Sequence, residues 1–268
     1  MSDKPAAPHP LTPTLSPGRR EGWGEGETPT GICLAANDTL PGADLTRLLA
    51  WLSPGFPVGG YSYSHGIEYA VESGRVRDRV SLTGWIGAIL EHGTGRTDAV
   101  LFAAAHRAVT AGNESAFAWA VERADVLRGA RELALESSAQ GAAFLSTLRA
   151  AWPAPAFERW AAAIAATGRP PAYPVAVATA AAASGIAMLP ALTAFLHAFA
   201  ANLVSAGVRL IPLGQTDGQK AIAALDPVVH SMAGIALALP LDDLGGRAPM
   251  IDGCAMSHET QYTRLFRS

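Results

Sequence analysis

Cysteine is scarce in this sequence. The 268 residues contain only Cys33 and Cys254, and no Cys-x-x-Cys pair occurs. The scarcity excludes a local cysteine zinc site and a dithiol redox motif. A single disulfide between the two cysteines stays open, but we expect reduced thiols in a cytoplasmic protein.

Charge is scarce as well. Charged residues make up 16% of the chain, hydrophobic residues make up 49%, and the formal net charge is -3. A protein that binds nucleic acid through phosphates needs a basic surface, which this composition does not supply. We therefore expect no nucleic-acid partner. Much of the hydrophobic share is alanine, which favours closely packed helices.

Long, strongly apolar runs are missing too. The most membrane-like stretch, residues 175–213, is interrupted by Pro190, carries Arg209 and owes its apolarity mostly to alanine. A membrane-spanning helix needs about 20 predominantly apolar residues. The N-terminus shows no basic head followed by an apolar run, so no signal peptide is predicted. We expect a pair of buried helices and no membrane contact; a small membrane-associated helical protein is the alternative.

Residues 1–43 differ in composition from the rest of the chain. They are rich in Pro, Gly, Thr and Glu and show almost no apolar periodicity. Such a segment buries too little apolar surface to offset the entropy lost on ordering. We expect a disordered extension. Its resemblance to the translated repeat peptide found at misplaced bacterial start sites suggests that the functional protein begins near Asp44.

From Asp44 onward, apolar residues recur with the 3.6-residue period of an α-helix. Asp44 is placed to cap a first helix with an apolar stripe, and Asn113 is placed to cap a later one. Similar patterns continue to Leu239, before a tail rich in Gly, Pro and Asp, and no β-alternation is evident. The sequence predicts one all-α domain over residues 44–268, with about eight to ten helices. The stripe of the first helix consists of Leu45, Leu48, Leu49 and Leu52.

Common signatures of catalysis are absent. In GQTDGQKA the Lys does not follow Gly directly and no Ser or Thr follows the Lys, so the stretch is not a phosphate-binding loop. GGYSYSHG lacks the Gly-x-Ser-x-Gly spacing of a nucleophile elbow. No two histidines stand two, three or four positions apart, the usual spacing for local metal chelation, although ligands distant in sequence stay open. We predict no catalytic, cofactor-binding or metal-ligating residues, which points to binding or scaffolding.

One carboxylate pair has an ordinary explanation. Glu132 and Glu136 lie one helical turn apart, with Arg128 and Arg131 nearby. The spacing is typical of a salt-bridged helix face.

The stretch PGFPVGGYSYSHGIEYAVESG combines a turn with a short helix. Gly59 and Gly60, with the neighbouring prolines, predict a tight reversal of the chain. Treated as a helix from Tyr63, the remainder places Tyr63, Ile67, Ala70 and Val71 on a core face. The opposite face carries an aromatic ring among carboxylates, which suits a partner-facing patch, with a merely solvated face as the alternative. That face consists of His65, Glu68, Tyr69 and Glu72.

The last residues, HETQYTRLFRS, are unusually apolar for a chain end. Aromatic and Arg side chains together are typical anchors of protein interfaces. Either a partner covers this segment or it packs back on its own domain. The candidate partner-binding residues are Tyr262, Arg264, Leu265, Phe266, Arg267 and Ser268.

Four stretches together resemble the urease accessory protein UreF family. They are SPGFPVGGYSYSHGIEYAV, PVAVATAAAASGI, SAGVRLIPLGQTDGQ and the terminal RLFRS, and they occur in the family's order. The resemblance covers roughly Asp44 to Ser268 and leaves out the first 40 or so residues. Four separate matches are more specific than any one short motif.

The resemblance implies an all-helical, dimeric protein without enzymatic activity. Members of the family bind the accessory protein UreD, also called UreH, and the pair recruits the GTPase UreG, which carries nickel to apo-urease. This chain would then couple GTP hydrolysis to nickel insertion. Whether nickel contacts the chain itself stays open. The alternative is a GTPase-activating protein that supplies a catalytic Arg in trans, either Arg264 or Arg209.

The resemblance also assigns roles to matching residues. It implies that the C-terminal residues dock on the UreD/UreH-like partner, and that Tyr69 and Arg264 shape the surface offered to the UreG-like GTPase. Arg209 lies in an apolar segment, so we expect it to be buried and paired with Asp217 or with a helix C-terminus. The signature residues with an expected structural role are Gly59, Gly60, Arg209, Gln215, Asp217 and Gln219.

Overall fold

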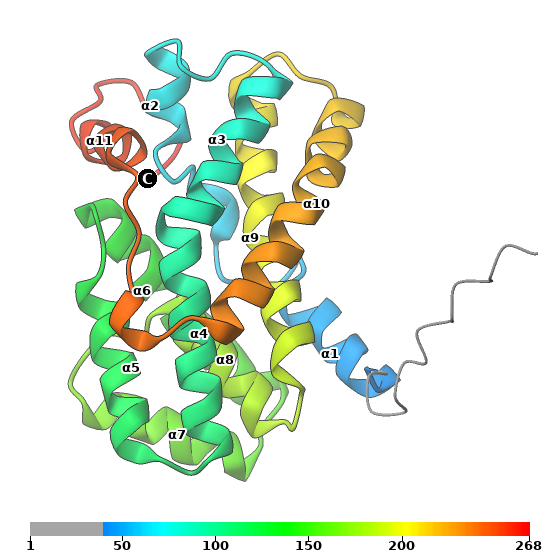
Figure 1. Ribbon diagram of the computed structural model, residues 1–268, viewed down its shortest axis with the longest axis vertical. Helices are drawn as coiled ribbons and strands as arrows, with labels where there is room; N and C mark the ends of the chain where they lie inside the picture. The colour runs from blue at the N-terminus through cyan, green and yellow to red at the C-terminus, as the bar shows by residue number, and fades with distance from the viewer. Residues whose placement is uncertain (1–39) are drawn as a thin grey trace, which may run out of the picture. The chain divides into compact units, whose positions relative to one another are not determined.

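The computed structural model describes residues 40–268, which form α-helices joined by short loops and no strand (Figure 1). The expected all-α class is confirmed. The described residues contain eleven α-helices and two short 3-10 helices, η1 (Gly60–Ser62) and η2 (Leu241–Asp243). The α-helices are α1 (Gly42–Trp51), α2 (Ile67–Glu72), α3 (Arg79–His92), α4 (Thr94–Thr110), α5 (Glu114–Val126), α6 (Arg131–Ala151), α7 (Pro155–Ala166), α8 (Tyr173–Ala183), α9 (Met188–Leu210), α10 (Gln215–Ala238) and α11 (Pro249–His258).

Helix α1 begins three residues earlier than expected, with Pro41 in place of Asp44 as the N-cap. The carbonyl of Pro41 accepts the first amide hydrogen bonds, and Asp44 lies inside the helix, where it pairs with Arg47 at 3.3 Å instead of capping. Leu48 is buried, but Leu45 and Leu49 are exposed, so the predicted apolar stripe is only partly covered. The remaining residues of the predicted disordered extension, 1–39, lie outside the described part of the chain.

Prolines mark two further differences from local preference. α10 continues through Pro227, a residue type that normally ends or kinks a helix, because packing along α9 and α3 offsets the hydrogen bond that the proline cannot donate. α11 forms within the tail that looked irregular, and Pro249 stands at its first position, where its missing N–H costs nothing. The cap expected at Asn113 is confirmed, because its side chain accepts from the Ala116 amide at 3.0 Å.

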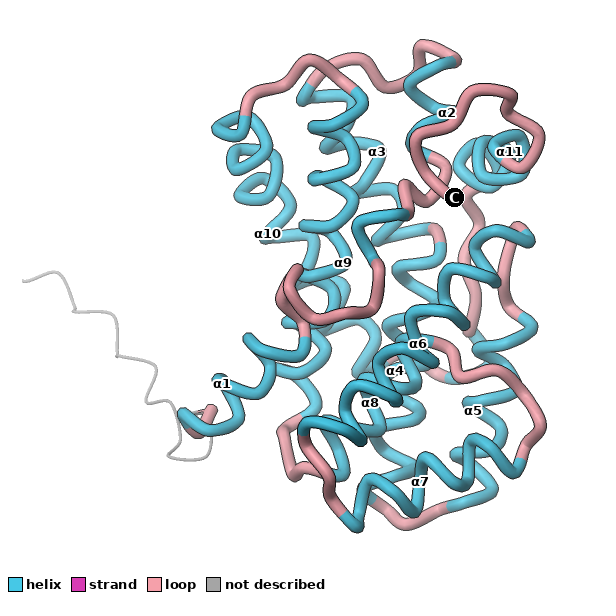
Figure 2. Tube along the Cα trace, turned by 180° about the vertical axis from the view of Figure 1, so that it is seen from behind, coloured by secondary structure: helices cyan, strands magenta, loops and turns pink. Residues whose placement is uncertain are grey.

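The core is built around α4 and α8, which pack against each other (Figures 1 and 2). Nearly every residue of α4 and eight residues of α8 are buried, and small alanine side chains let their backbones approach closely. α5 and α7 lie at one end of this unit, whereas α2, α11 and the chain end lie together at the other. The second group positions the candidate site.

The membrane-like stretch, residues 175–213, forms most of α8 and all of α9. By length and composition, α9 and α10 could each cross a membrane. Half of the most apolar window of α9 and a third of that of α10 are buried inside the protein, and core helices of soluble proteins pass the same test. The stretch therefore gives only weak support to the membrane alternative.

His106 predicts part of the acid sensitivity of the fold. Its Nε2 lies 2.9 Å from the Ile186 carbonyl, and burial lowers the pKa of the imidazole. The unfolded chain takes up the proton more readily, so the free energy of unfolding should fall as the pH drops below about 6.5. We expect His106→Gln, which keeps an N–H donor, to lose this part of the pH dependence in urea titrations between about pH 7 and 5. The exposed His230→Gln is the control, and equal slopes in wild type and His106→Gln would contradict the assignment.

Candidate functional site

The chain enters α2 through a left-handed turn. Gly59 and Gly66 have φ angles of 73° and 78°, and His65 has a φ of 58°, which is unusual for a residue with a side chain. α2 therefore begins at Ile67 rather than at Tyr63. A Cβ on Gly66 would lie 2.8 Å from Cα of Ala255, so the glycine lets α11 approach the turn closely.

The predicted outward face of this stretch is wrong for two of its four residues. His65 and Glu68 are buried, Tyr69 is half-buried, and only Glu72 is exposed. His65 precedes the helix and so leaves the helical register, while α11 and the chain end cover Glu68. The expected core residues Tyr63, Ile67 and Ala70 are buried, and Val71 is partly buried.

The C-terminal segment, residues 261–268, folds onto α2 and the turn before it (Figure 1). The two carboxylate oxygens of Glu68 accept from the amides of Leu265 at 2.6 Å and Phe266 at 2.9 Å. The Arg267 amide donates to the Ser62 carbonyl at 2.8 Å. Phe266 and Ser268 are buried as a result. Of the two possibilities that the sequence left open, the structure has the segment packed on its own domain.

A buried histidine links α11 and the segment to α6. His258 has no exposed surface. Its Nε2 lies 3.0 Å from Glu68 Oε2, and its Nδ1 lies 2.6 Å from Glu132 Oε2. The other oxygen of Glu132 is 2.6 Å from Nη1 of Arg264. The side chains of Glu68, His258, Glu132 and Arg264 therefore form one connected network that joins α2, α11, α6 and the C-terminal segment.

A second buried cluster lies beside the first. Glu136 Oε2 is 2.8 Å from Ser268 Oγ and 3.3 Å from His65 Nδ1. The other ring nitrogen of His65 is 2.5 Å from Thr94 Oγ1. The side chain of Ser268 thus joins the C-terminal segment to α6, and Glu136 and His65 continue this chain of hydrogen bonds to Thr94 of α4.

The expected salt-bridged face of α6 is wrong. Glu132 and Glu136 point to the two histidine clusters, while Arg128 pairs with Asp98 at 2.8 Å. Burial raises the pKa of Asp98, and the Arg128 guanidinium opposes that rise. These pairings join residues 30 or more positions apart, which i,i+4 spacing does not predict.

Arg209 belongs to the same surface but is not buried as expected. Its Nη1 donates to the Tyr61 carbonyl at 2.8 Å, and its guanidinium lies 4.4 Å from the ring centroid of Phe266. Partial burial lowers the pKa of the guanidinium. The predicted pairing with Asp217 is wrong, because Asp217 pairs with Lys220 at 3.3 Å and Arg79 at 3.9 Å. The cation–π contact instead holds the segment against α9.

The other signature residues divide into two groups. Gly60 belongs to η1, and its carbonyl accepts from the Asn202 side chain at 3.0 Å. Gln215, Asp217 and Gln219 lie in the first turns of α10. Within residues 40–268, no hydrogen bond or ion pair joins those three to the C-terminal segment.

The docked segment leaves a mixed surface facing outward. Tyr262 and Leu265 are exposed, as are Arg264 and Arg267, and Tyr61 is exposed on neighbouring η1. Aromatic and Arg side chains of this kind are enriched in protein interfaces. We call this set the docking surface.

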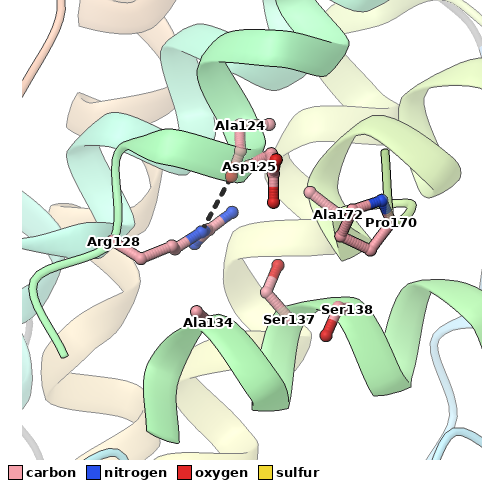
Figure 3. A pocket seen from close by; sticks show the side chains of 8 residues that line it. All are labelled: Ala124, Asp125, Arg128, Ala134, Ser137, Ser138, Pro170 and Ala172. Carbon is pink, nitrogen blue, oxygen red and sulfur yellow. Dashed lines mark hydrogen bonds between the residues drawn. The ribbon is translucent and has the colours of Figure 1, made fainter. Parts of the chain in front are cut away.

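A small pocket elsewhere offers no alternative site for a cofactor. It lies between the end of α5, α6 and the residues before α8, and its volume is about 10 Å³ (Figure 3). Such a volume admits one water-sized group. Among the described residues, no group of three or more His, Cys, Asp or Glu side chains is arranged to hold a metal ion.

Comparisons with known proteins place the chain among relatives over most of its length. The UreF family model matches residues 76–226. A protein of Rhodopseudomonas palustris (strain BisB18) is 50% identical over 234 residues, which cover 87% of this chain and 96% of that protein. A Xanthobacter autotrophicus protein is 50% identical over 224 residues, with 84% and 91% covered. A Bradyrhizobium diazoefficiens protein is 47% identical over 226 residues, with 84% and 92% covered. All three are named urease accessory protein UreF.

Proposed function

Because the chain belongs to the UreF family of urease accessory proteins, we propose that it assists nickel insertion into apo-urease. Together with a UreD/UreH-like partner it recruits a UreG-like GTPase and couples GTP hydrolysis to nickel delivery. It acts in the cytoplasm as a non-catalytic chaperone and homodimer, with residues 44–268 as the working domain.

One observation carries this proposal: three signatures that are far apart in the sequence meet directly beneath the docking surface, where they hold the C-terminal segment in place. Glu68 belongs to the first, Arg209 to the third, and Phe266 to the last. The carboxylate of Glu68 binds the Phe266 amide, and the Arg209 guanidinium lies over the Phe266 ring. The convergence supports a role for this surface in binding the UreD/UreH-like partner and the GTPase.

The contacts of the two candidate arginines favour a non-catalytic role over a trans-acting Arg. Arg264 is 2.6 Å from Glu132, and Arg209 is bound to the Tyr61 carbonyl and the Phe266 ring. Either guanidinium would have to leave these contacts to enter a partner's active site. An Arg finger contributes about 10³–10⁵ to the rate of GTP hydrolysis. Single-turnover hydrolysis by the GTPase with wild type, Arg264→Ala and Arg209→Ala therefore separates the two functions.

Complex formation tests the proposal directly. We expect the wild-type chain to pull down the UreD/UreH-like partner and, with it, the GTPase. Deletion of residues 262–268 should remove both, because it removes the exposed side chains of the segment. Leu135→Ala, on the exposed face of α6, is the control for the general effect of a surface substitution. Unchanged capture after the deletion would overturn the role of the docking surface.

A further inference from the structure

The hydrogen bonds of His258 require a particular protonation state. Both ring nitrogens face carboxylate oxygens, at 2.6 Å and 3.0 Å, and the side chain has no exposed surface. A neutral imidazole has one N–H donor, whereas the imidazolium has two. Only the doubly protonated ring donates to both Glu68 and Glu132. Loss of one proton would turn a ring lone pair toward a buried carboxylate.

The charges around His258 balance only in that state. The charged groups that face the ring from other elements are Glu68 of α2 and Glu132 of α6, and Arg264 of the C-terminal segment pairs with Glu132. Two negative charges then meet the imidazolium and the guanidinium. On α11 itself, the thiol of Cys254 lies one turn earlier, and burial raises its pKa, so it stays neutral.

Glu68 connects this charge balance to the C-terminal segment. The same carboxylate that faces His258 Nε2 accepts the amides of Leu265 and Phe266. If the His258 ring loses its second proton, the Glu68 or the Glu132 carboxylate stays buried without a cationic partner on the ring. Release of the segment would expose these groups to water and relieve that cost.

The neighbouring His65 does not impose the same requirement. One of its nitrogens faces Glu136, but the other faces the hydroxyl of Thr94. A hydroxyl both donates and accepts, so a neutral imidazole satisfies both contacts. The need for two protons is therefore specific to His258.

We propose that His258 is a proton-dependent lock on the docking surface. The C-terminal segment is docked while both ring nitrogens are protonated, and it is released when the ring loses one proton as the pH rises. The docked state holds one more proton than the released state. The equilibrium constant for docking should therefore fall by about tenfold per pH unit once the released ring has lost that proton. The lock regulates the surface used in the proposed function, but docking is measurable on the isolated chain without any partner.

Selective isotope labelling tests the lock on the full-length protein. We expect the imidazole ¹⁵N signals of His258 to show two protonated nitrogens in the docked state, because each ring nitrogen must donate to a carboxylate. In the same state, the amide signals of Leu265 and Phe266 should show carboxylate hydrogen bonds. As the pH is raised in steps, the ring and amide signals should change together, with one midpoint.

Two variants separate the lock from a general loss of structure. In Glu132→Gln, the new amide can donate to Nδ1 while Nε2–H still donates to Glu68, so a neutral ring is satisfied. The segment should then stay docked across the range, and the pH dependence should disappear. His258→Gln should also lose the pH dependence, whereas the exposed His230→Gln should retain the wild-type profile.

Two results would overturn the lock. One is a singly protonated His258 ring in a protein whose Leu265 and Phe266 amides are docked. The other is a wild-type pH profile in Glu132→Gln. Neither result depends on capture of a partner. A protein whose segment docks and releases with pH, but which binds no partner, would refute the proposed function and support the lock.

Discussion

Replacing Glu68 by Gln is expected to release the C-terminal segment. The substitution removes the charge that pairs with His258 and replaces one carboxylate oxygen by an NH₂ group, so one of the Leu265 and Phe266 amides loses its acceptor. Breaking a buried pair costs about 3–5 kcal/mol. Because the segment can detach and become hydrated, we expect the loss to fall on docking rather than on unfolding of the helical body. Trypsin cleavage after Arg264 and Arg267 should then accelerate by about 100-fold or more.

Glu72→Gln is the matched control for this substitution. Glu72 ends the same helix and bonds to the side chain of Gln261, but it is exposed. A surface substitution of this kind changes stability by about 0.5 kcal/mol or less. Equal protease sensitivity of the two variants would show that Glu68 does not hold the segment.

Phe144→Ala should cause the largest loss of global stability among the changes considered. The ring is fully buried on α6, 5.2 Å from the ring of Phe56, 5.9 Å from Tyr173 and 6.4 Å from Trp51. It therefore joins α1, the turn that precedes η1, and α8. Truncating a buried Phe to Ala typically costs about 3–5 kcal/mol, and the rigid aromatic neighbours limit collapse into the cavity. Urea unfolding followed by circular dichroism measures the loss.

Leu135→Ala on the same helix gives the comparison. Leu135 is 55% exposed, so its truncation should change the free energy of unfolding by about 0.5 kcal/mol or less. A Phe144→Ala variant as stable as Leu135→Ala would mean that the aromatic cluster does not hold α1 and α8 together.

The sequence predicts the helical body well because the information there is local. The apolar, alanine-rich run of α8 and the cap at Asn113 are read from neighbouring residues, and both agree with the structure. Boundaries were less predictable where tertiary packing overrides local preference, as at Pro227 inside α10.

The site was less predictable because its contacts join distant positions. Glu68 and His258 are 190 residues apart, and His65 and Glu136 are 71 apart, so no spacing rule connects them. A left-handed residue at 65 also removed the helical register on which the outward face depended. The aromatic and Arg content of RLFRS did single out the segment, but not the carboxylates that hold it.

Nickel content of urease is the most direct test of the proposed function. Urease would be purified from cells that lack this chain, cells that carry the wild type, and cells that carry the chain without residues 262–268. Nickel per urease subunit is then measured by mass spectrometry. We expect full loading only with the wild-type chain and a loss of most of the nickel in the other two strains. Urease fully loaded in the absence of the chain would contradict its role in nickel delivery.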